Sequence, residues 1–126
     1  MRLSEVQLGG VSYPAAFTLR VAMETAERYG DVDAVLEPDL PTAAALERKA
    51  WILAAMLRAG QKAAKATGAE TPEPPTADDL LDGYVVAEVK QINQAILTVM
   101  AADSKTNVET VELGPDEKNA AATPVP

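Results

Sequence analysis

Cysteine and histidine are both absent from this sequence of 126 residues, and aromatic residues make up only 4% of it. The first absence excludes disulfide bonds and a thiol nucleophile, and the second excludes an imidazole base and the usual zinc sites. Hydroxyl side chains are present, but no base suited to activating them as nucleophiles accompanies them. We therefore expect no enzymatic activity, no catalytic residues, no metal and no cofactor.

Long apolar runs are missing as well, so the sequence predicts no membrane-spanning segment. Residues 1–5 lack the basic and then apolar stretch of a signal peptide, and the lack of cysteine fits a reducing compartment. We expect a cytoplasmic protein. Its length suffices for one domain, and 24 alanines beside few aromatic residues favour a thin, helix-rich core.

Basic residues are scarce in the second half of the chain. Residues 1–67 carry eight acids and eight bases, residues 68–102 carry six acids and one base, and residues 103–126 carry five acids and two bases. The net charge of -8 therefore arises entirely after residue 67. A chain of this charge repels phosphate backbones, so we expect no binding to nucleic acid.

Alternation of polar and apolar residues predicts a β-hairpin at the N-terminus. Residues 4–8 and 11–15 carry the alternation, and two glycines stand between them at the turn. A two-stranded ribbon is only marginally stable by itself, so we expect it to lie on helices. Leu3 and Phe17 are the candidate anchors.

Helical spacing of apolar residues predicts about four helices. Thr18, Thr42 and Thr76 stand where N-capping residues are expected. The stretch 50–57 is apolar on all sides, which indicates a central buried helix. Gly60 either ends this helix or only weakens it, and we favour continuation. The predicted helices cover residues 18–29, 42–68 and 76–100, with a short helical piece at 31–36 and a linker at 69–75.

Helical periodicity stops after Ala102. Residues 103–126 mix polar residues, glycine and prolines with scattered valines, and such a segment cannot bury enough apolar surface to order itself. A strand at 108–113 that pairs with the hairpin is the alternative. The predicted fold class is therefore mainly α: a small helical domain over residues 1–102 with an N-terminal β-hairpin, followed by a disordered acidic C-terminal tail.

A structural role is enough to explain two features of the sequence. Asp78, Asp79 and Asp82 form the densest acidic cluster, but acids in a first helical turn complement the helix dipole. Trp51 lies among large apolar residues, so we expect it in the core.

Basic residues on one helix face are the candidates for binding a partner. Arg58, Lys62 and Lys65 follow one polar face and can grip an acidic partner, although bases near a helix end are also common for electrostatic reasons. Tyr84 belongs to the apolar stripe of the last predicted helix. We take these four residues as the candidate partner-binding set.

Several short segments follow one another in an order seen in one protein family. After the hairpin come Phe17–Arg20, Glu24–Gly30, Asp33–Leu36, Leu46–Leu57, Arg58–Gly60, Lys65–Gly68, Thr76–Leu81 and Ile92–Val99. In this order, over roughly residues 3–102, the chain resembles the tail assembly chaperones of long-tailed bacteriophages and prophages.

The resemblance implies a function that composition and periodicity do not. Such a chaperone is a non-enzymatic, mostly helical protein of the host cell cytoplasm. It binds the tape measure protein, keeps that long chain soluble, and is displaced as tail tube subunits polymerise, so it is absent from the mature virion. Members often occur also in a form extended by ribosomal frameshifting. The implied partners are the tape measure protein, the frameshifted extended form and the tail tube protein. Whether the protein also forms a homo-oligomer is left open by the resemblance.

Two other classes of function compete with this interpretation. A structural component of the virion, in the tail or at the head-tail junction, would persist in purified particles. An acidic mimic of nucleic acid would compete with DNA for a basic partner, in a manner that depends on salt.

Overall fold

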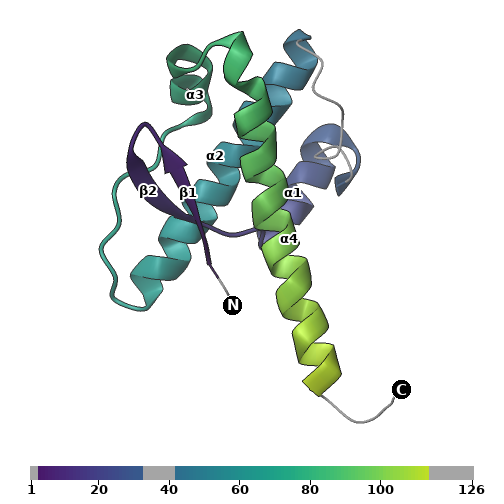
Figure 1. The fold of residues 1–126 in the computed structure, drawn as a ribbon. Helices are drawn as coiled ribbons and strands as arrows, with labels where there is room; N and C mark the ends of the chain where they lie inside the picture. The colour runs from purple at the N-terminus through teal and green to yellow at the C-terminus, as the bar shows by residue number, and fades with distance from the viewer. Residues whose placement is uncertain (1–2, 33–41, 114–126) are drawn as a thin grey trace.

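The computed structural model describes residues 3–32 and 42–113, and side chains as far as Ala102. Figure 1 shows helices gathered around one long helix, with a small hairpin on their surface. The mainly α fold with an N-terminal hairpin is as predicted. The elements are β1 (Ser4–Leu8), β2 (Val11–Ala15), α1 (Leu19–Tyr29), α2 (Ala43–Ala66), α3 (Ala77–Gly83), the 3-10 turn η2 (Val86–Glu88) and α4 (Val89–Leu113).

The hairpin forms where the alternation predicts it. Strands β1 and β2 pair antiparallel, with Ser4 opposite Ala15 and Leu8 opposite Val11. Gly9 and Gly10 both have positive φ, +57° and +80°, which a tight two-residue hairpin turn of type I′ requires at both central positions. Val6 is the buried residue of β1, and Phe17 packs against the core as predicted.

Threonine caps begin the first two helices as the sequence predicts. Thr18 Oγ1 accepts a hydrogen bond from the Val21 N–H at 3.2 Å, and Thr42 Oγ1 accepts one from the Ala45 N–H at 3.2 Å. Helix α1 ends at Tyr29, and Gly30 caps it in the left-handed conformation, with a φ of +89°. The Gly30 N–H donates a hydrogen bond to the Ala26 carbonyl at 2.7 Å. These caps satisfy backbone groups that the helix itself leaves unpaired.

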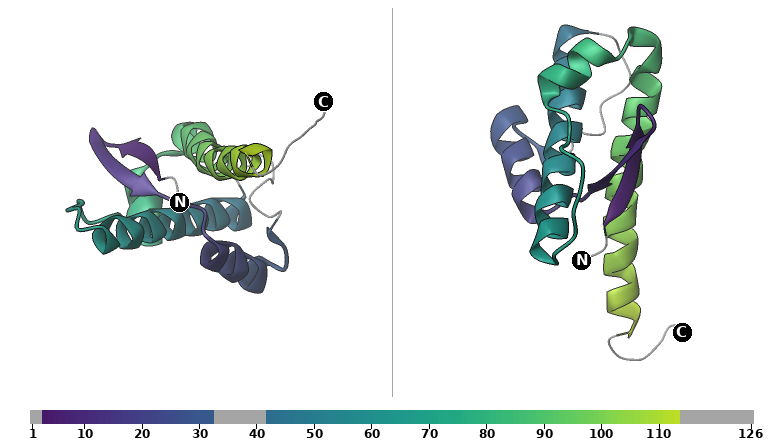
Figure 2. Two further views of the ribbon diagram at one scale, coloured as in Figure 1. Left: turned by 90° about the horizontal axis from the view of Figure 1, so that it is seen from below. Right: turned by 90° about the vertical axis from the view of Figure 1, so that its left-hand side faces the viewer.

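Helix α2 is the centre of the fold. Its side chains Ile52, Leu53, Met56 and Leu57 are almost completely buried, which confirms the prediction from the apolar stretch. Strand β2 and helices α1, α3 and α4 all pack against it. Figure 2 shows α1 on one side of α2, and the hairpin and α4 on the other.

Gly60 lies inside α2, so the helix continues through it as we favoured. A Cβ at this position would collide with the backbone of Pro14 and Ala15, which rests directly on the helix. Next to this contact, the Ala16 N–H donates a hydrogen bond to the Met56 carbonyl of α2 at 3.1 Å. Because Gly60 has no side chain, the main chain of the hairpin can pack directly against α2.

The single helix predicted over residues 76–100 is wrong, because the chain leaves the helical path after Gly83. Tyr84 is extended, with φ -123° and ψ 146°, and the 3-10 turn η2 precedes α4. Glycine has low helix propensity, which weakens the helix at this point. The Glu88 carboxylate also accepts a hydrogen bond from the Val85 N–H at 2.9 Å, which stabilises the new start.

Helix α4 continues beyond the predicted domain boundary at Ala102 and ends at Leu113. The strand considered for residues 108–113 is therefore wrong. Extending an existing helix costs less than nucleating one, and the first glycine and proline after Ala102 stand at 114 and 115. Residues 114–126 of the predicted tail, and most of the short helical piece at 31–36, lie outside the described residues.

Candidate functional site

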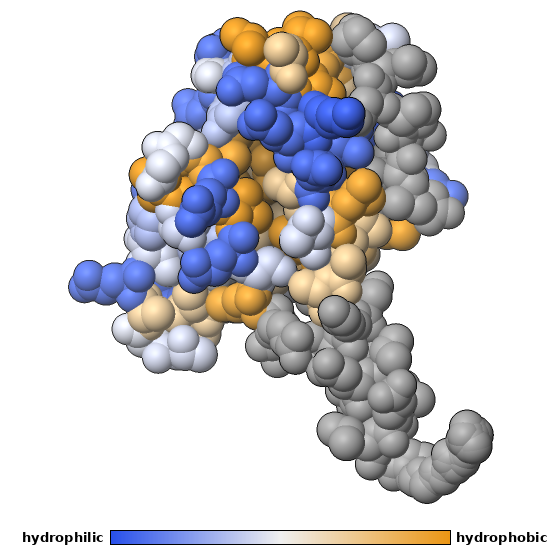
Figure 3. All heavy atoms as spheres, viewed as in Figure 1, coloured by the Kyte–Doolittle hydropathy of each residue, from blue (hydrophilic) through white to orange (hydrophobic). Residues whose placement is uncertain are grey.

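Large apolar side chains are exposed where α3 passes into α4. Leu81, Val85 and Val86 are 44%, 65% and 62% exposed. They border a hollow of about 120 Å³, and we call these three residues with the hollow the apolar mouth. Figure 3 shows hydrophobic surface at this end of the molecule. The remaining residues that line the hollow are Leu46, Lys49, Ala50, Leu80, Tyr84, Val89 and Ile92.

The break between α3 and α4 sets where these side chains lie. Leu81 is exposed within α3, where Leu80 is the buried residue. The extended backbone at Tyr84 and the 3-10 turn that follows leave Val85 and Val86 exposed beside it. Periodicity alone therefore could not identify these residues as surface.

A buried cation lies in the wall of the hollow. Lys49 is only 6% exposed, and its Nζ donates a hydrogen bond to Asn93 Oδ1 at 2.8 Å. A buried ammonium group is stable only with such polar partners, so this contact ties α2 to α4 behind the apolar mouth. The wall is thereby held in place by a polar contact, while the entrance is apolar.

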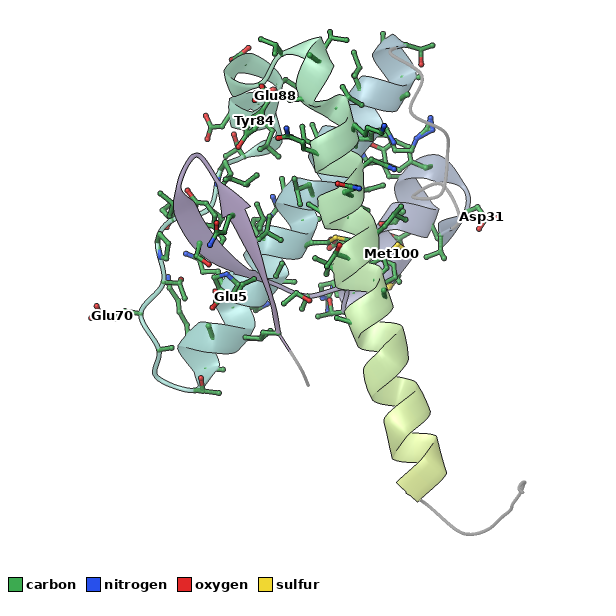
Figure 4. All side chains as sticks on the ribbon, viewed as in Figure 1. Glu5, Asp31, Glu70, Tyr84, Glu88 and Met100 are labelled. Carbon is green, nitrogen blue, oxygen red and sulfur yellow. The ribbon has the colours of Figure 1, made fainter. Side chains whose placement is uncertain are left out.

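Tyr84 separates the apolar mouth from a second hollow. It is half-buried and lines both the 120 Å³ hollow and one of about 410 Å³ that reaches the hairpin turn at Gly9. Burial raises the pKa of the Tyr84 phenol above its ordinary value, and the charge of Glu88 adds to this. Figure 4 shows the two residues close together beside α3.

The structure brings the three predicted basic residues into one groove between α1 and α2. Arg58, Lys62 and Lys65 line this groove, of about 690 Å³, and Arg20 of α1 joins them from the opposite side. Glu24 is the one acid in its lining. Tyr84 does not line it, so the predicted set divides between two surfaces. Arg20 was missed because helical spacing relates residues within a helix and not across two helices.

Trp51 is half-buried and does not lie fully in the core as predicted. Its ring meets that of Tyr29 edge to face, with centroids 5.7 Å apart, and the Arg28 guanidinium lies 5.2 Å from its centroid. Arg28 also pairs with Glu47 at 2.8 Å, and the Tyr29 hydroxyl donates to the same carboxylate at 2.9 Å. These contacts join the C-terminal end of α1 to α2, so we assign them a structural role.

Charge and burial set the pKa values in this cluster. The hydrogen bond from Arg28 lowers the pKa of the Glu47 carboxyl below its usual value. Burial is the main cause that raises the pKa of the Tyr29 phenol. The carboxylate and the neutral phenol are therefore the forms that the fold favours.

Compared with known protein families, curated proteins and solved structures, the chain matches none. Within residues 3–32 and 42–113, no helix has the length and apolar character needed to cross a membrane. Nor does the described part of the chain gather three acidic side chains into a group that could hold a metal ion. What the chain does must therefore be inferred from its own surfaces and from the order of its segments.

Proposed function

We propose that this protein is a phage tail assembly chaperone that binds the tape measure protein through the apolar mouth. The observation that carries the proposal is the exposure of Leu81, Val85 and Val86 around a hollow. Contiguous exposed apolar surface of this kind is typical of a binding site for a protein partner. The order of the segments, which resembles that of the chaperone family, supports the same function.

The size of the apolar mouth suits a complex that has to come apart. A hollow of about 120 Å³ has room for little more than one side chain of the partner. Burying an exposed aliphatic side chain fully contributes about 1.5–3 kcal/mol, and part of that is lost to the cost of association. The contact of one chaperone is thus weak, and many copies along one long chain can be displaced in turn by tail tube subunits.

Net charge supports the same role. The chain carries -8 in total, and the acidic excess lies in the half that contains the apolar mouth. Like-charged particles repel one another, so a tape measure protein coated with this chaperone would stay dispersed. The proposed role is non-enzymatic and belongs to the host cytoplasm before assembly is complete. A frameshift-extended form of this chain and the tail tube protein are further partners in the same proposal.

The test is co-expression with the tape measure protein encoded near this gene. We expect the wild-type chain to keep that protein in the soluble fraction. Val85→Ser with Val86→Ser should abolish this effect while the far-ultraviolet circular dichroism stays unchanged, since both side chains are exposed. The matched control is Leu19→Ser with Met23→Ser, because these apolar residues of α1 are also exposed but lie away from the mouth.

Two results would contradict the proposal. One is a tape measure protein that is equally insoluble with and without this chain. The other is recovery of this chain in stoichiometric amounts from purified particles, which would indicate a structural component of the virion. If the control pair abolishes solubilisation as strongly as the pair at the mouth, the mouth is not the binding site.

A further inference from the structure

The groove between α1 and α2 has a floor of small residues and a basic rim. Ala55, Ala59 and Ala63 recur at intervals of four along α2 and line the floor together with Val21 of α1. Small side chains let another helix approach closely. The rim consists of the exposed cations Arg20, Arg58, Lys62 and Lys65. The basic groove, as we name this surface, is therefore shaped for a helix that carries acids.

The basic rim is unusual in a chain of net charge -8. Within the described residues, none of the four cations is in an ion pair. Arg58 and Lys62 are four residues apart and Lys62 and Lys65 three, so neighbouring like charges repel each other along α2. An acidic segment bound in the groove would offset this repulsion, which destabilises α2 when the groove is empty.

An acidic helical segment of suitable pattern is present in the chain itself. Helix α4 includes residues 103–113, which contain three acids and one base. Valines stand at positions 108 and 111 of this segment, and glutamates at positions 109 and 112. The segment therefore has apolar residues suited to the alanine floor and acids suited to the basic rim.

The arrangement of the helices points to a second copy as the source of this segment. Figure 1 shows the C-terminal part of α4 running past the rest of the fold, and Figure 2 shows α4 on the side of α2 opposite α1. The basic groove lies between α1 and α2, so a straight α4 leads away from it within one molecule. We propose that the basic groove of one copy binds residues 103–113 of a second copy.

A reciprocal exchange closes the assembly as a dimer. Each copy would donate one segment and receive one, which is the symmetry of most protein dimers. The hollow of the apolar mouth is lined by residues from α3 to the first turn of α4 and by Leu46, Lys49 and Ala50 of α2, and it shares no residue with the basic groove. Dimer formation is thus independent of the function proposed above, and either proposal can fail without the other.

The test uses the full chain and sedimentation velocity at low salt. We expect the wild type to dimerise, and to dissociate at about 1 M salt, where electrostatic interactions are screened within a few ångström. The groove variant, Lys62→Glu with Lys65→Glu, and the helix variant, Glu109→Lys with Glu112→Lys, should each associate at least about tenfold more weakly. Lys90→Glu, an exposed cation outside the groove, is the control and should dimerise as the wild type does.

Mixing the two charge-reversed variants gives the decisive result. The acidic groove of the first then fits the basic helix of the second, and the basic groove of the second fits the acidic helix of the first. We expect the equimolar mixture to form a heterodimer. A wild type that stays monomeric up to about 1 mM, or a mixture that stays monomeric, would overturn the proposal.

The lack of cysteine in the chain allows a second measurement. Ala63→Cys and Val108→Cys, each made in a separate copy, should form a mixed disulfide when the two copies are oxidised together. If instead both changes made in one chain give an intramolecular disulfide in preference to the crosslinked dimer, residues 103–113 bind their own groove and the dimer is refuted.

Discussion

Gly60→Ala provides the sharpest test of how the hairpin is held on α2. Alanine is a better helix former than glycine by about 1 kcal/mol, so local propensity predicts stabilisation. The added Cβ would meet the backbone of Pro14 and Ala15, which cannot rotate away as a side chain can. Forcing one methyl group into a tightly packed site costs about 1–3 kcal/mol, and a backbone neighbour places the cost at the upper end.

We therefore expect Gly60→Ala to destabilise the fold by about 2 kcal/mol. The measurement is the free energy of unfolding from urea titration, followed by circular dichroism at 222 nm. Gly83→Ala is the matched control, because Gly83 also lies in a helix but has no atom near the position of a Cβ. It should be neutral or stabilise the protein by up to about 1 kcal/mol. A Gly60→Ala protein that is as stable as the wild type, or more stable, would refute the main-chain docking of the hairpin.

Further changes test the core, a cap and the cluster between α1 and α2. Leu53→Ala, at a side chain with no exposure, should cost about 3–5 kcal/mol in the free energy of unfolding, and a cost below about 1 kcal/mol would mean that α2 is not central. Thr76→Ala removes a cap in which Thr76 Oγ1 accepts from the Asp79 N–H at 3.1 Å and Asp79 Oδ2 accepts from the Thr76 N–H at 3.0 Å. Thr76→Ala should lower the free energy of unfolding by about 1 kcal/mol. Asp79→Ala, which removes one of the two hydrogen bonds, should lower it by part of that amount. The Glu47 pKa should lie below its usual value in the native protein, when followed by NMR titration, and rise in Arg28→Ala, which removes the main cause of the lowering. Because folding lowers this pKa, the small stabilisation is present above the unfolded pKa and is lost as pH falls through the folded pKa; a gain in stability on acidification from this group would contradict the assignment.

Local rules of helix and turn formation explain what was predictable here. The two glycines of the hairpin, the threonine caps and the apolar stretch of α2 each act on neighbouring residues, so the sequence alone locates them. The break after Gly83 is different, because the apolar spacing continues across it. What ends the helix is a combination of a poor helix former and the Glu88 hydrogen bond to the Val85 N–H, and neither is visible as a change in periodicity.

The candidate surfaces were predictable only in part, for a geometric reason. Three cations on one face of α2 could be recognised, since they share a helix. The fourth, Arg20, joins them only because α1 packs beside α2, which depends on tertiary contacts. The apolar mouth depends in the same way on the break between α3 and α4. Sequence reasoning located the segments but not how they combine.

The central position of α2 also has a consequence for synthesis on the ribosome. The hairpin and α1 emerge before α2, yet both pack against it. A two-stranded ribbon and a short isolated helix are each marginal in water, so neither is stable until its support exists. Pro14 and Ala15 cannot reach their contact until the nascent chain has extended past Gly60. The N-terminal half therefore stays unfolded until α2 has emerged, and a pause in translation before that point would leave it exposed to proteases.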